Sequence, residues 1–185
     1  MKDALDEFAK LNYKGKGKKL FEGLYIGQLP GAPEQQGEFS IKFFYNNPEK
    51  EKVPDLKEKD ESYFEDHMQV ITFNPLYCWD NLEFAERRAE EINLHPSFKA
   101  TNPMIHEFAH LLHVMDSPKA FYFYAENEPE IEEKPIIQMV SDYATNNVGE
   151  FVAEYISGRL AGKTYPKVVD ALYKKYGGPD LFSSI

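Results

Sequence analysis

The stretch MIHEFAHLLH, residues 104–113, places His106, Glu107 and His110 in the order His-Glu-x-x-His. An α-helix has 3.6 residues per turn, so residues i and i+4 lie on one face and both imidazoles can reach one metal ion. Glu107 projects beside the pair and can reach a water in an open coordination position, as a zinc peptidase requires. Because so short a pattern also arises by chance, the surrounding sequence has to support it.

The flanking residues predict that this stretch is a buried helix. Asn102 is a good N-cap, Pro103 suits the first turn, and Asp116-Ser117-Pro118 ends the helix. Apolar residues cover nearly the whole circumference, which is typical of a helix packed on several sides. Two histidines and a glutamate are costly to bury there without partners, and a metal removes that cost. The alternative is that they are satisfied core groups or a solvent-facing strip.

A third ligand is expected downstream, because catalytic zinc usually takes three protein ligands and a water. Residues 141–161 predict a helix with Asn146 or Asn147 as cap, and it carries Glu150 and Glu154 on one face. One carboxylate can bind the metal while the other accepts a hydrogen bond from the free ring nitrogen of a ligand histidine. The alternative is a solvated acidic face in an acidic protein.

HEFAH followed by Tyr143-x6-Glu150, within YATNNVGEFVAEY, resembles the catalytic domain of the anthrax lethal factor type of zinc peptidase, a gluzincin. The resemblance covers about residues 100–160. It implies one zinc ion per chain, bound by His106, His110 and Glu150.

The same resemblance implies that Glu107 is the general base and that the Tyr143 hydroxyl stabilises the transition state. It also implies that Glu154 supports a ligand histidine from behind. The expected function is therefore that of a zinc-dependent metalloendopeptidase acting on a protein or peptide substrate.

For the fold, the resemblance implies an α+β, zincin-like domain with a small twisted sheet and the active-site helix above a cleft and the glutamate helix below it. We expect a single domain over residues 1–185, with an upper part over about 1–115 and a lower helical part over about 116–185. Patterns of β-branched and aromatic residues predict strands at three segments: 23–27, 39–46 and 69–74. The 69–74 strand is either an edge that pairs with extended substrate or an ordinary interior strand.

Other features have weaker implications. The aromatic and acidic insertion at 121–133 departs from the family pattern and bears on the shape of the cleft. His113 lies roughly 10 Å along the helix from His106, too far to share an ion, and is expected to hydrogen-bond near the helix end as a mildly favoured cation. His67 and His95 lie in polar, loop-like surroundings and are assigned no role.

Composition narrows the possible classes. In 185 residues, 42% hydrophobic and 15% aromatic content is ample for a core, and the lone Cys78 excludes an internal disulfide. A net charge of −10 argues against nucleic acid and anionic membranes as partners. We find no leader-like start and no long apolar stretch, so we expect a location in the cytoplasm or export without a leader. The composition indicates no particular oligomeric state.

Two alternatives to the peptidase stay open. The first is a binding or structural module that keeps a metal for folding or has lost turnover because the insertion at 121–133 blocks the cleft. The second is a regulatory peptidase that cleaves repressors and shares the His-Glu-x-x-His pattern. The Glu-Phe-Val-Ala-Glu run and the offset of Tyr143 fit the second alternative less well.

Overall fold

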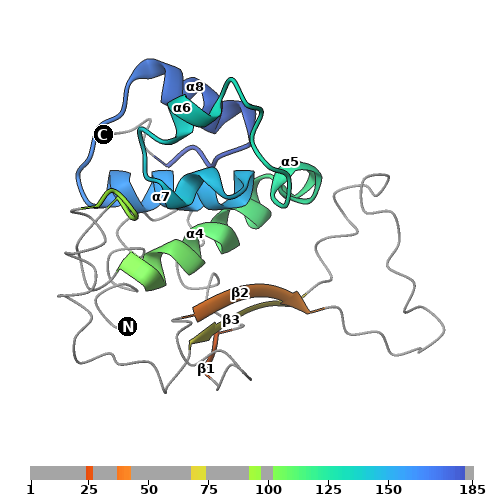
Figure 1. Ribbon diagram of the computed structural model, residues 1–185. Coiled ribbons are helices and arrows are strands. Elements are labelled where there is room, and N and C mark those ends of the chain that lie inside the picture. The colour runs from red at the N-terminus through yellow and green to blue at the C-terminus, as the bar shows by residue number, and fades with distance from the viewer. Residues whose placement is uncertain (1–23, 27–36, 43–67, 74–91, 97–101, 182–185) are drawn as a thin grey trace.

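The computed structural model describes residues 24–26, 37–42, 68–73, 92–96 and 102–181. The strands are β1 (Leu24–Ile26), β2 (Gly37–Lys42) and β3 (Met68–Phe73), and the helices are α4 (Asn102–Asp116), α5 (Pro118–Tyr124), α6 (Lys134–Ile137), the 3₁₀ turn η6 (Tyr143–Thr145), α7 (Val148–Leu160) and α8 (Lys167–Lys175). Figure 1 shows α7 between α4 on one side and α6 and α8 on the other. The strands lie on the far side of α4.

Helix α4 forms where it is predicted. It begins at Asn102, carries Pro103 in its first turn and ends at Asp116, directly before Ser117 and Pro118. Its apolar side chains are buried around almost the whole helix. This burial agrees with the predicted composition of a helix packed on several sides.

Helix α7 is the centre of the apolar core. Asn147 caps it, because the side-chain oxygen of Asn147 accepts a hydrogen bond from the backbone N–H of Glu150 at 2.8 Å. Eight consecutive residues, 151–158, are buried. The core joins α7 to α4, α6 and α8 through these buried residues: Ala109, Ile137, Val140, Ala144, Val148, Phe151, Val152, Ala153, Tyr155, Ile156, Val169, Leu172, Tyr173 and Tyr176.

The three strand segments agree with the predicted positions as far as the structure describes them, but one interpretation of them is wrong. β3 pairs with β1 in parallel and with β2 in antiparallel, so the strand order is β1-β3-β2. Both sides of β3 are therefore hydrogen-bonded to neighbours. The suggestion that the 69–74 strand is the edge that receives substrate is excluded, and the interior alternative holds.

The predicted α+β, zincin-like fold class is also wrong for the main body of the structure. Residues 92–96 and 102–181 form helices and turns and contain no strand. The physical reason is that the two motif-bearing helices pack on each other and on α8 through apolar side chains. Helix-on-helix packing thus builds the core of this part of the chain.

Helix α5 has no counterpart among the predicted elements. It has a proline in its first turn, begins three residues before the supposed insertion at 121–133 and includes the aromatic run at 121–124. Ala125, just after it, packs against α7 where Gly149 leaves room, since a Cβ at Gly149 would lie 3.2 Å from the Ala125 Cβ. Part of the insertion is thus helical structure packed against α7.

The predictions for His67 and Cys78 fall on residues outside this description, as do the predicted strand ends at 23, 27, 43–46 and 74. Among the described helices, none combines the length and the apolar composition needed to cross a bilayer.

Candidate metal centre

The predicted ligand residues come from two helices that pack on each other. His106 and His110 are one turn apart on α4, and Glu150 lies in the first turn of α7, directly above its cap. His106 is 8% exposed, so the cluster lies at the buried interface between the helices.

The three ligand atoms converge on one point. His106 Nε2 lies 2.8 Å from Glu150 Oε2 and 3.1 Å from His110 Nε2, and His110 Nε2 lies 3.7 Å from Glu150 Oε2. Atoms of all three side chains fall within 4.8 Å of one another. Two imidazole nitrogens and a carboxylate oxygen are a donor set that zinc accepts.

The hydrogen bonding of Glu150 Oε2 shows whether a cation would suit the space between the three side chains. This oxygen is buried and accepts no hydrogen bond as long as His106 Nε2, 2.8 Å away, carries no proton. A proton on His106 Nε2 would satisfy it, and the negative charges and hydrogen bonds of Glu150 and Glu154 outweigh burial and raise the pKa of His106 well above its usual value. One proton, however, cannot bridge all three atoms. A divalent cation among them would accept one lone pair from each of the three atoms, so the residues fit a metal ion.

Glu154 lies behind His106, as the resemblance implies. It is fully buried, and its Oε1 accepts a hydrogen bond from His106 Nδ1 at 2.7 Å. Burial alone would raise the pKa of Glu154, but hydrogen bonds from His106 and His95 outweigh it and lower the pKa to about 2. An ionised carboxylate only accepts, so Nδ1 of His106 carries the proton and Nε2 is left to bind a metal.

Tyr143 lies beside the ligand cluster at the start of η6. Its ring centroid is 5.8 Å from that of His106. Burial raises the pKa of Tyr143, and the negative charges of Glu150, Glu107 and Glu154 raise it further against the opposing effect of His106. The phenol is therefore protonated at neutral pH and can donate a hydrogen bond.

Glu107 follows His106 on α4 and is half-buried. Its charge is close enough to Tyr143 to contribute to the raised pKa of that phenol.

His113 behaves differently from the prediction of a cationic ring. It is completely buried, and its Nε2 donates a hydrogen bond to the backbone carbonyl of Tyr176 at 2.9 Å. Burial lowers the pKa of His113 to about 4, so the ring is neutral. The predicted hydrogen bond near the helix end exists, but the charge does not.

Two residues near the centre had no predicted role. His95 Nδ1 lies 3.2 Å from Glu154 Oε2, and the Ser141 hydroxyl donates to the same oxygen at 2.8 Å. A signal for His95 was present, because a carboxylate that uses one oxygen to hold a ligand histidine needs a donor for the other. Outside α4 the chain has two histidines, His67 and His95.

The chain matches no family model, no curated protein and no solved structure. The argument for function therefore depends on the site itself.

Proposed function

We propose that this chain is a zinc-dependent metalloendopeptidase that binds one zinc ion through His106, His110 and Glu150. The observation that carries the proposal is the convergence of three ligand atoms within 4.8 Å on a buried Glu150 oxygen that lacks a hydrogen bond. The described part of the cluster offers three protein ligands, which is the number typical of catalytic zinc with a water in the remaining position.

The roles we propose for the surrounding residues are those that the resemblance implies. A zinc ion held there would lower the pKa of a bound water to about 7 and polarise a carbonyl group. Glu107 accepts the proton of the attacking water and passes it to the leaving amine. Tyr143 donates a hydrogen bond to the oxygen that becomes negative, because its raised pKa keeps the phenol protonated.

The substrate class rests on the resemblance of HEFAH and Tyr143-x6-Glu150 to the lethal factor type of peptidase. Bond hydrolysis by a zinc-activated water suits amides, and the resemblance narrows the amide to a peptide bond. We therefore propose a protein or peptide as the substrate.

The experiment combines metal analysis with cleavage profiling. The purified chain should contain one zinc per molecule by mass spectrometry of the metal and should cleave members of a peptide library until a chelator is added. Glu107→Gln should keep the zinc and lower kcat by about 10² to 10⁴, the range for loss of a general base. Glu126→Gln, which changes an exposed glutamate, is the matched control and should cleave as the parent does.

Two results would count against the proposal. Equal cleavage by Glu107→Gln and the parent would remove the general-base assignment. Stoichiometric zinc without any cleavage in the library would favour the metal-stabilised binding module instead.

A further inference from the structure

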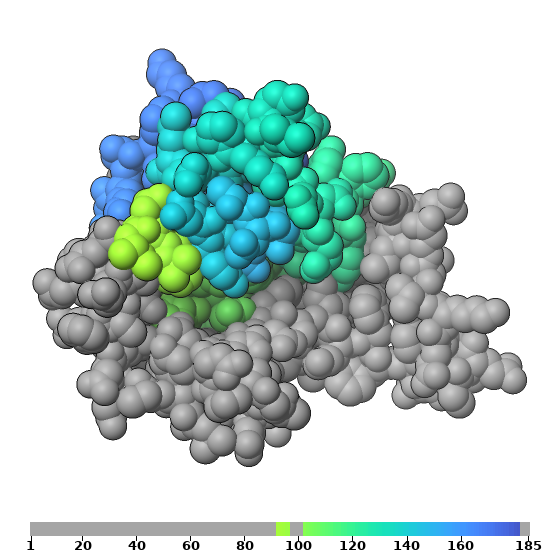
Figure 2. Space-filling model, in the orientation of Figure 1, coloured from red at the N-terminus to blue at the C-terminus, as the bar shows by residue number. Residues whose placement is uncertain are grey.

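The segment 92–96 is held against the entrance to η6. The backbone N–H of Asp142 donates to the Asn93 carbonyl at 2.7 Å, and that of Tyr143 donates to the Leu94 carbonyl at 3.1 Å. Asn93 has a φ of 56°, a left-handed conformation that asparagine tolerates well. Figure 2 shows this segment, in yellow-green, on the surface beside the blue-green residues that follow α5.

The end of the same segment is fixed on α7. Pro96 is buried next to Gly158, where an added Cβ would lie 3.1 Å from the proline Cβ. The chain therefore runs over α7 in a defined position, with His95 facing Glu154, one helical turn before Gly158.

His95 contacts two parts of the candidate centre at once. Its Nδ1 lies 3.2 Å from Glu154 Oε2, and its ring centroid lies 5.1 Å from that of Tyr143 at a tilt of 55°. One ring thus joins the carboxylate that holds His106 to the phenol expected to act on substrate.

Glu154 transmits the first of these contacts. Its Oε1 accepts a hydrogen bond from His106 Nδ1 at 2.7 Å, and its Oε2 accepts hydrogen bonds from His95 Nδ1 and the Ser141 hydroxyl. With both oxygens occupied, the carboxylate cannot rotate without losing a hydrogen bond in a fully buried site. The orientation of the His106 ring is therefore tied to the position of His95.

We propose that His95 is a positioning residue with two separable effects. Through Glu154 it fixes the tautomer and direction of His106 and so strengthens zinc binding. Through its ring it holds the Tyr143 phenol in place and so raises kcat. The first effect depends only on the ligand cluster, whereas the second rests on the proposed peptidase activity.

Two substitutions separate the effects. His95→Asn places an amide N–H near the position of Nδ1, so it keeps a donor for Glu154 but removes the ring beside Tyr143. His95→Phe keeps a ring beside Tyr143 but removes the donor. The readouts are the zinc Kd by competition with a chelating dye, kcat and KM at saturating zinc, and the melting temperature of the zinc-free protein.

We expect opposite patterns from the two variants. His95→Phe should weaken zinc binding by about 10- to 100-fold, the usual effect of losing a partner behind a ligand histidine, with kcat at saturating zinc near that of the parent. His95→Asn should bind zinc within about threefold of the parent, whereas kcat falls by about tenfold with little change in KM. A purely structural role would lower the melting temperature and move both readouts together, and that result would overturn the proposal.

The outcomes also distinguish this inference from the proposed function. If the parent binds zinc but cleaves nothing, the peptidase proposal fails while the zinc Kd of His95→Phe still tests His95. If the parent binds zinc and shows zinc-dependent cleavage, and both variants have the same zinc Kd and kcat as the parent, only the inference about His95 fails. A parent that binds no zinc would overturn both.

A measurement on the unaltered protein covers the case in which the variants do not fold. Nitrogen NMR of the histidine rings should show the proton on Nδ1 in both His95 and His106, because each of these atoms faces an oxygen of the ionised Glu154. An unprotonated His95 Nδ1 would contradict the proposed contact.

Discussion

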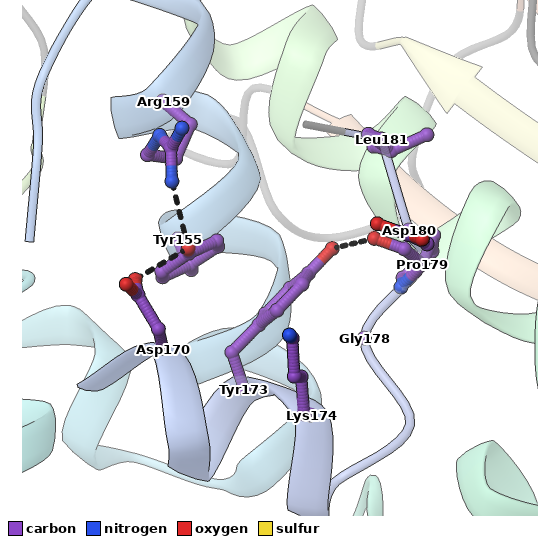
Figure 3. Close-up of a pocket in the computed structure, with 9 residues that line it drawn as sticks. All are labelled: Tyr155, Arg159, Asp170, Tyr173, Lys174, Gly178, Pro179, Asp180 and Leu181. Atoms are coloured by element: carbon purple, nitrogen blue, oxygen red, sulfur yellow. Dashed lines mark hydrogen bonds between the residues drawn. The ribbon is translucent and has the colours of Figure 1, made fainter. Parts of the chain in front are cut away.

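The two sides of α7 satisfy their polar groups in different ways. Toward α8, the Tyr155 hydroxyl donates to Asp170 Oδ1 at 2.7 Å and accepts from Arg159 at 3.0 Å, as Figure 3 shows. The rings of Tyr155 and Tyr173 stack with centroids 4.0 Å apart, and the Tyr173 hydroxyl donates to the Pro179 carbonyl. These donors and acceptors match one another, whereas the buried Tyr165 hydroxyl, on the ring packed beside Tyr155, has no hydrogen-bond partner in the described structure.

Toward α4, two buried atoms of the described residues, Glu150 Oε2 and His113 Nδ1, have no hydrogen-bond partner. Glu154 has a partner for each oxygen, but Glu150 Oε2 faces two imidazole nitrogens and accepts no hydrogen bond. Burying polar atoms in this way costs free energy unless a further group binds them. The α4 side is therefore the side on which a cation is expected to stabilise the protein.

The comparison also shows that a cavity does not by itself identify the candidate functional site. A cavity of about 170 Å³ lies on the α8 side, lined by residues that include Tyr155, Asp170 and Leu181. The convergent ligand atoms lie on the α4 side. Metal-binding atoms that converge on one point are the better guide here than the cavity.

The largest expected effect is a loss of bound zinc, and it should distinguish two carboxylate-to-amide substitutions, one on each side of α7. Glu150→Gln removes the anionic ligand, so zinc should no longer copurify at one per chain. Asp170→Asn changes a carboxylate that bonds only within the protein in the described contacts, and zinc content and cleavage should stay within about twofold of the parent. Metal analysis of the two variants checks this, and equal zinc loss in both would abolish the distinction between the sides.

The next effect concerns His113, which lies on α4 like the proposed ligands, donates from Nε2 to a backbone carbonyl near the end of α8 and has a buried Nδ1 without a partner. Its pKa is lowered from 6.5 to about 4 by burial. Between these values the unfolded chain binds a proton that the folded chain does not. Stability should therefore fall as the pH drops from 6.5 to about 4, by about 3 kcal/mol in total.

The comparison with His113→Gln isolates this contribution. The glutamine amide can still donate to the carbonyl but does not titrate. Urea unfolding at pH 7 and pH 4.5 should show a smaller loss of stability in the variant than in the parent, since all other titrating groups are common to both. The same pH dependence in both proteins would show that the proton is bound elsewhere.

The smallest effect is expected from Tyr155→Phe on the α8 side. It removes one hydroxyl that bonds to Asp170 and Arg159, and the free energy of unfolding should fall by about 1 kcal/mol, because each such bond contributes modestly when water can replace it. Zinc content should not change. Chemical denaturation checks the first statement, and a drop in zinc content would mean that the two sides of α7 are coupled.

Local sequence signals predicted the elements that carry the site. Asn147 caps α7 and Pro118 follows the end of α4, both as the residue types indicate. The fold class and the edge position of β3 were wrong, because strand patterns reveal neither the order of strands nor which surface builds the core. Helix α5 was not predicted either, since its aromatic run has no clear helical periodicity.

The sequence by itself determined which residues share a helical face: His106 with His110, and Glu150 with Glu154. From spacing alone, either carboxylate could have been the ligand. The tertiary structure set Glu150 against the Nε2 atoms and Glu154 against Nδ1, and it brought His95 to the same carboxylate from 59 residues away. Periodicity fixes positions around one helix, whereas the distance between helices depends on how their apolar side chains pack.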